Sequence, residues 1–163
     1  MMSRRNILLG LGAFSTVMAG VRGLLPGAPA HATRSYELTR TDAEWQKLLP
    51  PDRYHVLRKA GTERPHSSPL NKEKRAGIYT CAGCALPLFA SRTKFESGTG
   101  WPSFWQALDK AVVEESDTAL FIKRTEVLCA RCGGHLGHVF DDGPKPTGLR
   151  YCMNGVAMNF KAT

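Results

Sequence analysis

The sequence contains one stretch that decides its fold, Cys129-Ala130-Arg131-Cys132-Gly133-Gly134-His135-Leu136-Gly137-His138-Val139-Phe140. It opens on a Cys-x-x-Cys pair, and the same pattern occurs upstream in Cys81-Ala82-Gly83-Cys84. Two intervening residues allow a tight turn that aims both sulfurs at one ion, and Gly83 and Gly133 give each turn a permissive backbone. Four thiolates favour tetrahedral zinc, with iron a less favoured occupant. We therefore predict that the two pairs share one metal ion.

The distance between the two pairs bears on the kind of site. The interval from Cys84 to Cys129 is longer than the roughly 15 to 20 residues of a compact zinc ribbon, so the ion would join distant parts of the chain. Four protein thiolates leave no open coordination position, which predicts a structural ion rather than a catalytic one. The alternative, a thioredoxin-like redox pair, lacks the βαβ pattern that such a motif needs.

Cys152 is the fifth cysteine and has no partner once the two pairs hold a metal. A lone cysteine is commonly a small buried apolar residue, so its neighbours decide how it is interpreted. Arg150 precedes it by two positions and would share its face of a strand, where a cation favours the thiolate. His135 and His138 are redundant as metal ligands beside four cysteines and would be more useful as proton donors, although they could be ordinary loop residues.

A glycine- and proline-fixed turn, Gly98-Thr99-Gly100-Trp101-Pro102-Ser103-Phe104-Trp105, carries two indole rings. Aromatic residues of this kind most often belong to the core. They also suit a wall for a thioether or sulfoxide methyl group, because sulfur contacts with aromatic rings are favourable.

The first 32 residues have the pattern of an export signal. Arg4 and Arg5 stand directly before an apolar stretch at 7–21, and Ala30-His31-Ala32 offers a cleavage site before Thr33. This predicts a twin-arginine signal peptide at 1–32, carried by the twin-arginine translocase, and a mature domain at 33–163 in the periplasm or outside the cell. The alternative, an uncleaved membrane anchor, is disfavoured because spanning a bilayer takes about 20 consecutive apolar residues.

Composition indicates one ordinary globular domain. The chain has 163 residues, of which 42% are hydrophobic and 22% charged, so it can bury a modest core. The net charge of +8 includes three arginines of the leader, and the remaining basic residues are scattered. We therefore expect no nucleic-acid partner. We also expect a monomer without a stable membrane anchor.

Local patterns predict two short helices followed by strands. Thr41-Asp42-Ala43-Glu44 is a capping box that starts a helix ending at Pro50-Pro51, and a second helix runs from Pro51 to a stop at Gly61. Residues 62–75 lack periodicity and predict an irregular arm. Beyond the arm, short β-like runs separated by turns predict strands at 78–80, 94–96, 111–115, 119–123, 127–130, 138–140 and 156–160.

These motifs together resemble the B-type methionine sulfoxide reductases, the family that reduces the R epimer at sulfur. The matching elements run in order through almost the whole mature chain. They are Gly61-Thr62-Glu63, Gly77-Ile78-Tyr79-Thr80-Cys81-Ala82-Gly83-Cys84, Leu88-Phe89, Lys94-Phe95-Glu96-Ser97-Gly98, Gly100-Trp101-Pro102-Ser103-Phe104, Cys129 to Phe140 as quoted above, Asp142-Gly143-Pro144, Pro146-Thr147-Gly148 and Arg150-Tyr151-Cys152-Met153-Asn154.

The resemblance implies a mainly β fold of two antiparallel sheets with short N-terminal helices and a structural Zn²⁺ on Cys81, Cys84, Cys129 and Cys132. It implies that the Cys152 thiolate attacks the sulfoxide sulfur and ends as a sulfenic acid. The substrate would be methionine sulfoxide, free or in oxidised proteins. The resemblance also assigns the other site residues: Trp101 and Phe104 bind substrate, His135 and His138 donate protons or orient water, Asn154 fixes hydrogen bonds, and Arg150 keeps Cys152 ionised.

Thr99 departs from part of that family, many members of which carry a resolving cysteine at this position. With four cysteines on zinc no such thiol remains, so we expect an external thiol to reduce the Cys152 sulfenic acid, either a thioredoxin-like protein or a small molecule. Two other functions are compatible with parts of the sequence. A zinc-knuckle binding module would leave the leader and the set of Trp101, His138 and Cys152 unexplained, and a peroxide-reducing thiol protein would leave the aromatic turn unexplained.

Overall fold

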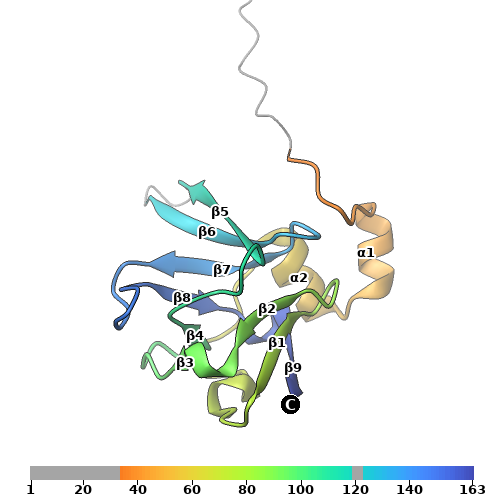
Figure 1. Ribbon diagram of the computed structural model, residues 1–163. Coiled ribbons are helices and arrows are strands. Elements are labelled where there is room, and N and C mark those ends of the chain that lie inside the picture. The colour runs from red at the N-terminus through yellow and green to blue at the C-terminus, as the bar shows by residue number, and fades with distance from the viewer. Residues whose placement is uncertain (1–33, 119–122) are drawn as a thin grey trace, which may run out of the picture. The chain divides into compact units, whose positions relative to one another are not determined.

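The computed structural model describes residues 34–118 and 123–163 (Figure 1). The predicted leader, its cleavage site and most of the strand expected at 119–123 lie outside the described residues. Residues from Arg34 to Thr163 form one compact unit. In the described part of the chain, no helix is long and apolar enough to cross a membrane.

Two short helices open the domain where the sequence predicts them. Helix α1 (Asp42–Leu48) has the predicted capping box, in which the Thr41 amide donates to the Glu44 carboxylate at 2.7 Å and the Glu44 amide donates to the Thr41 hydroxyl at 3.3 Å. Helix α2 (Pro51–Lys59) follows directly. The predicted stop at Gly61 was wrong by one residue, since Ala60 adopts the left-handed conformation with φ 51°.

The smaller sheet has three antiparallel strands in the order β2 (Pro87–Ala90), β1 (Gly77–Cys81) and β9 (Met158–Ala162). The strand predicted at 156–160 begins later than expected. A short 3-10 turn, η4 (Gly155–Ala157), precedes it because the Glu63 carboxylate accepts the amides of Gly155 and Val156 and holds them out of the strand.

The larger sheet has six antiparallel strands in the order β3-β4-β8-β7-β6-β5. Their bounds are β3 (Lys94–Phe95), β4 (Ser103–Phe104), β8 (Arg150–Met153), β7 (His135–Phe140), β6 (Arg124–Cys129) and β5 (Val112–Asp117). The irregular arm predicted at 62–75 contains one 3-10 turn, η1 (Pro69–Lys72), and a second turn, η2 (Ser91–Thr93), leads into β3.

The core lies between the two sheets and under the helices. Trp45 and Leu57 come from the helices, and aromatic rings from the two sheets pack against one another, as Tyr79 does on Phe104. Alternation along each strand sends one set of side chains into this core and the other set outward. On the larger sheet the outward set carries the charged and chemically reactive residues. The predicted fold class, mainly β with two antiparallel sheets and short N-terminal helices, is confirmed.

Candidate active site and metal centre

The four paired cysteines form one compact cluster. Their sulfur atoms all lie within 4.8 Å of one another, and three of the four residues are buried. The closest contacts join one pair to the other: Cys81 Sγ lies 3.7 Å from Cys132 Sγ, and Cys84 Sγ lies 3.4 Å from Cys129 Sγ. Sulfurs about 2.3 Å from a tetrahedral ion are about 3.8 Å apart. The cluster therefore has the donor set and the size of a four-thiolate metal site.

The two Cys-x-x-Cys turns have the same backbone pattern. In each pair, the residue four positions after the first cysteine donates its amide to the carbonyl of that cysteine. Ala85 N–H donates to the Cys81 carbonyl at 2.8 Å, and Gly133 N–H donates to the Cys129 carbonyl at 2.9 Å. Both donors are left-handed, with φ 60° and 65°. The sequence prediction that Gly83 supplies the permissive backbone was therefore wrong for the first turn, where Ala85 does so.

The cluster connects the two sheets. Cys81 ends β1 of the smaller sheet, and Cys129 ends β6 of the larger one. The crowded sulfurs also alter one another's protonation: hydrogen bonds within the cluster lower the pKa of the Cys129 thiol and raise the pKa of the Cys81 thiol. Cysteine binds a metal as the thiolate, so binding of an ion to this cluster would release the protons that its thiols still hold.

Cys152 lies at the centre of the larger sheet. In the register of the strands it faces Ser103 of β4 on one side and His138 of β7 on the other. Directly opposed residues in an antiparallel pair project on the same face of the sheet. The side chains of Cys152 and His138 consequently meet on the outward face, and Cys152 remains partly exposed.

A cavity of about 130 Å³ opens over Cys152. This is smaller than the roughly 300 to 1,000 Å³ of sites for drug-sized ligands, and it suits the end of a side chain. Its lining combines one thiol with an aromatic wall, an imidazole, a guanidinium and an amide. The lining residues are Thr62, Trp101, Arg124, Gly137, His138, Phe140, Cys152 and Asn154.

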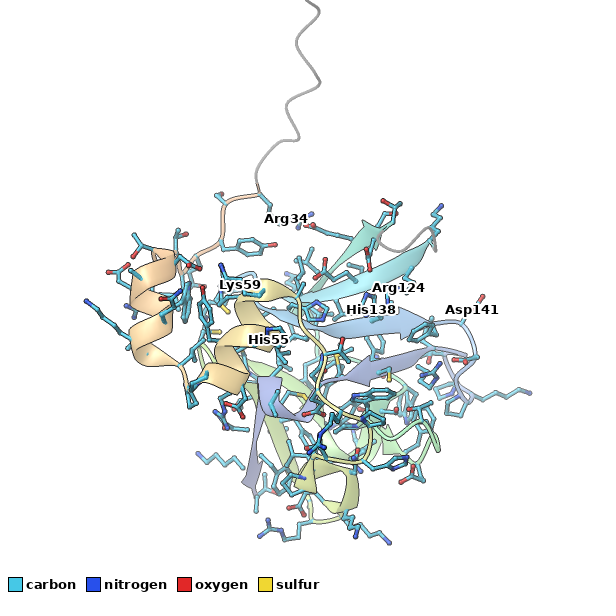
Figure 2. All side chains as sticks on the ribbon, turned by 180° about the vertical axis from the view of Figure 1, so that it is seen from behind. Arg34, His55, Lys59, Arg124, His138 and Asp141 are labelled. Carbon is cyan, nitrogen blue, oxygen red and sulfur yellow. The ribbon has the colours of Figure 1, made fainter. Side chains whose placement is uncertain are left out.

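His138 is held by a carboxylate. Its Nε2 lies 2.9 Å from Asp117 Oδ2, which Arg124 Nη2 also approaches at 2.6 Å. His138 and Arg124 come from the paired strands β7 and β6 (Figure 2). Burial lowers the pKa of His138, although the hydrogen bond with Asp117 opposes this shift. The ring is therefore neutral at neutral pH and would give up a proton readily once charged.

His135 is placed differently from His138. Only 4% of it is exposed, its Nδ1 lies 2.5 Å from Glu126 Oε1, and it does not line the cavity. Its ring centre is 5.5 Å from that of His138. Of the two imidazoles expected to act on substrate, His138 alone reaches the cavity, and His135 packs behind it.

Glu63 connects the irregular arm to the cavity. Its carbonyl accepts the Trp101 indole N–H at 3.2 Å, and its amide donates to Asn154 Oδ1 at 2.9 Å. Asn154 is buried and its Nδ2 donates to the Leu136 carbonyl at 3.1 Å. Burial raises the pKa of Glu63, an effect that the amides of Gly155 and Val156 oppose. The orientation of Trp101 and Asn154 therefore depends on one residue of the arm.

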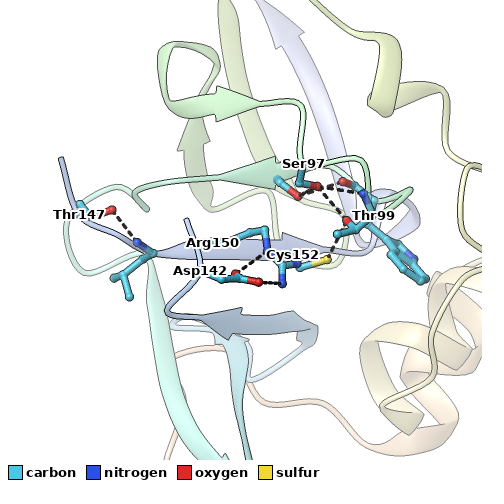
Figure 3. A network of polar contacts seen from close by, with 9 residues as sticks. Ser97, Thr99, Asp142, Thr147, Arg150 and Cys152 are labelled. Atoms are coloured by element: carbon cyan, nitrogen blue, oxygen red, sulfur yellow. Dashed lines mark hydrogen bonds and ion pairs between the residues drawn. The ribbon is translucent and has the colours of Figure 1, made fainter. Parts of the chain in front are cut away.

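Arg150 is engaged by Asp142 rather than by Cys152 alone. Its Nε and Nη2 each donate to a carboxylate oxygen of Asp142 at 2.8 Å, and its guanidinium lies 4.4 Å from the Phe140 ring centre (Figure 3). The Asp142 hydrogen bonds are the main cause that raises the pKa of Arg150, with Cys152 a lesser one. The positive charge expected at the thiol is thus shared with a carboxylate.

Phe104 does not reach the cavity, and the expectation that it binds substrate is corrected here. Its exposed fraction is 0%, and its ring stacks on Phe89 at 4.4 Å and meets the edge of Tyr79 at 4.9 Å. Phe104 neighbours Ser103 on β4, so the alternation of the strand sends it to the core face while Ser103 faces Cys152.

Several residues of the site had no assigned role in the sequence analysis. Asp117 and Arg124 belong to none of the motifs, and no local pattern indicates them. The others lie within quoted motifs, where their presence was the only available signal. These are Thr62, Glu63, Phe140 and Asp142.

Comparisons with known proteins agree with this geometry. The SelR domain family matches residues 49–162. A peptide methionine sulfoxide reductase MsrB of Methanosarcina barkeri is 57% identical over 123 residues, which cover 75% of this chain and 87% of that protein. One of Pseudomonas putida strain W619 is 55% identical over 126 residues, covering 77% and 95%. The chain therefore belongs to the MsrB family of peptide methionine sulfoxide reductases.

Proposed function

We propose that the protein reduces the R epimer of methionine sulfoxide to methionine, free or within proteins, through Cys152. The observation that carries this proposal is the cavity of about 130 Å³, which holds a thiol, an indole and an imidazole together. Similarity to proteins named peptide methionine sulfoxide reductase MsrB supports the same activity. The family match over residues 49–162 spans all the residues that line the cavity and the four paired cysteines.

In the proposed reaction, the Cys152 thiolate attacks the sulfoxide sulfur and forms a sulfur–sulfur bond, while the sulfur–oxygen bond of the substrate breaks and the oxygen leaves as water after taking up two protons. Water then attacks the Cys152 sulfur, the sulfur–sulfur bond breaks, methionine leaves and one proton is returned, so Cys152 ends as a sulfenic acid, oxidised, and the substrate is reduced. A proton is needed because the oxygen is a poor leaving group. His138 would supply it or orient the water that does, and Trp101 would hold the methyl group.

Regeneration would use two thiol groups from outside the chain. The first attacks the sulfenic sulfur and releases water, which leaves a mixed disulfide with Cys152, and the other then displaces Cys152 from this disulfide. Thr99 supports this step, because it stands 3.7 Å from Cys152 Sγ where a resolving cysteine would be able to react. Both a thioredoxin-like protein and a small thiol fit the requirement.

We also propose that the four-cysteine cluster binds a structural Zn²⁺. Four thiolates of this spacing match zinc better than other ions, and the ion would have no open position for chemistry. We also propose export through the twin-arginine translocase, cleavage near Ala32/Thr33 and a periplasmic or extracellular location, because Arg4 and Arg5 stand directly before an apolar stretch.

The purified protein can test the activity directly. Separate R and S methionine sulfoxides are offered with a dithiol reductant, and methionine is measured by chromatography. We expect the R epimer alone to be consumed, and Cys152→Ser to abolish turnover. Full activity of Cys152→Ser, or preference for the S epimer, would contradict the proposal. Metal analysis should give one zinc per chain, and a strong chelator should unfold the domain, because structural sites contribute folding energy.

A further inference from the structure

A chain of three hydroxyl groups leads from the sulfur of Cys152 into the neighbouring turn (Figure 3). Thr99 Oγ1 lies 3.7 Å from Cys152 Sγ and 2.8 Å from Ser97 Oγ. Ser97 Oγ lies 2.7 Å from Ser103 Oγ, which donates to the Trp101 carbonyl at 3.1 Å. The chain therefore begins at the reacting sulfur and ends on the backbone of a residue that lines the cavity.

The direction of these hydrogen bonds is determined by counting protons. Each hydroxyl has one proton to donate, and the Trp101 carbonyl can only accept. When Ser103 donates to Trp101, Ser97 must donate to Ser103 and Thr99 to Ser97, so the Cys152 thiol is left to donate to Thr99. A thiolate can only accept, so a hydrogen bond from Thr99 to an ionised Cys152 requires Ser97 to donate to Thr99 and Ser103 to donate to Ser97, and Ser103 then no longer donates to the Trp101 carbonyl.

We propose that Thr99 donates a hydrogen bond to the Cys152 thiolate, and that Ser97 and Ser103 are positioning residues whose hydrogen bonds reverse on ionisation of Cys152 and then hold Thr99 in this orientation. The backbone supports this arrangement. Thr99 lies between two left-handed glycines, Gly98 and Gly100, with φ 72° and 96°, and its amide approaches Ser97 Oγ at 3.4 Å. The threonine thus has a role at the sulfur beyond the absence of a resolving thiol.

This hydrogen bond matters because the other polar side chains near the sulfur already have partners. Arg150 is engaged by Asp142, Arg124 by Asp117, and His138 is neutral and bound to Asp117. Hydrogen bonds to ionised acceptors are stronger than neutral ones. Thr99 therefore supplies a dedicated donor where the nearby cations are shared with carboxylates.

The pH dependence of alkylation provides the test. The rate at which iodoacetamide modifies Cys152 is measured by mass spectrometry of its peptide, in the metal-loaded protein. Thr99→Val keeps the shape of the side chain and removes the donor. A less stabilised thiolate forms less readily but reacts faster. With the Brønsted coefficient of about 0.5 that holds for thiol–disulfide exchange, we expect modification about threefold slower at the acidic end and about threefold faster on the alkaline plateau.

Matched variants separate a hydrogen bond from a packing effect. Thr99→Ser should restore the wild-type profile, and Thr80→Val on β1 should leave it unchanged. Ser97→Ala should produce a smaller change of the same form, and this change should disappear when Thr99 is already valine. Parallel profiles for Thr99→Val and wild type, or an unchanged effect of Ser97→Ala in the double variant, would overturn the proposal.

The inference deepens the proposed function, but its test does not depend on turnover. Alkylation reports on the sulfur itself, with no sulfoxide or reductant present. If the reductase assay fails but the alkylation rates of wild type and Thr99→Val cross as pH rises, the proposed reaction is rejected and the hydrogen bond is retained. The reverse result would reject the hydrogen bond alone.

Discussion

Replacement of Phe104 by leucine separates the core of the domain from its cavity. The side chain is fully buried, and its ring makes two aromatic contacts, with Phe89 and Tyr79. Each such pair contributes about 0.5 to 1.5 kcal/mol, and the smaller leucine leaves part of the space empty. We expect Phe104→Leu to reduce the free energy of unfolding by about 2 to 3 kcal/mol. For a domain of this size, that loss lowers the melting temperature by about 8 to 10 °C.

The assay for this variant combines thermal melting, at matched metal content, with steady-state kinetics well below the melting temperature. We expect KM and kcat of the folded variant to stay close to wild type, since Phe104 lies on the core face of β4. Trp101→Phe is the control with the opposite pattern. Because the indole lines the cavity, its replacement should lower kcat/KM clearly while changing the melting temperature little. A raised KM without a lower melting temperature for Phe104→Leu would refute the reasoning.

Two further predictions concern the metal turns and His138. Gly133→Ala should destabilise the domain by more than about 1 kcal/mol, because φ is 65° and the added Cβ would meet the Tyr36 ring at 2.5 Å, whereas Gly83→Ala should be nearly neutral in urea titrations. Equal losses would contradict this account. Since burial lowers the pKa of His138, the unfolded chain takes up a proton near pH 6.5 that the folded chain does not, and stability should fall as pH drops below about 6.5. Urea midpoints of His138→Asn should depend less on pH over this range, and an unchanged slope would remove His138 as the cause.

Parts of the fold could be predicted because their signals are local. The capping box at Thr41 and the two Cys-x-x-Cys pairs are recognisable in short windows, and both occur where the sequence indicates. Strand β4 has only two residues and could not be recognised by periodicity, since its conformation depends on pairing with β8. The late start of β9 likewise depends on Glu63, which is distant in sequence.

The site shows the same division between local and distant causes. The spacing of Arg150 and Cys152 correctly indicated that they share a face, but it could not show that Asp142 engages the guanidinium. Phe104 was assigned to substrate because it belongs to an aromatic motif, and only the strand register reveals that it faces the core. The contact of Thr99 with Cys152 joins residues far apart in the chain, and no sequence window contains both.

The backbone of Cys152 is paired on both sides, with β4 and with β7, and this has a kinetic consequence. A strand held at both edges cannot carry its sulfur toward a distant partner, so on the proposed cycle the reductant must diffuse to an immobile sulfenic acid. An internal resolving thiol would act at a fixed effective concentration, independent of its surroundings. On the proposed cycle regeneration would instead be second order, and its rate would rise in proportion to the concentration of the external thiol until an earlier step limits turnover.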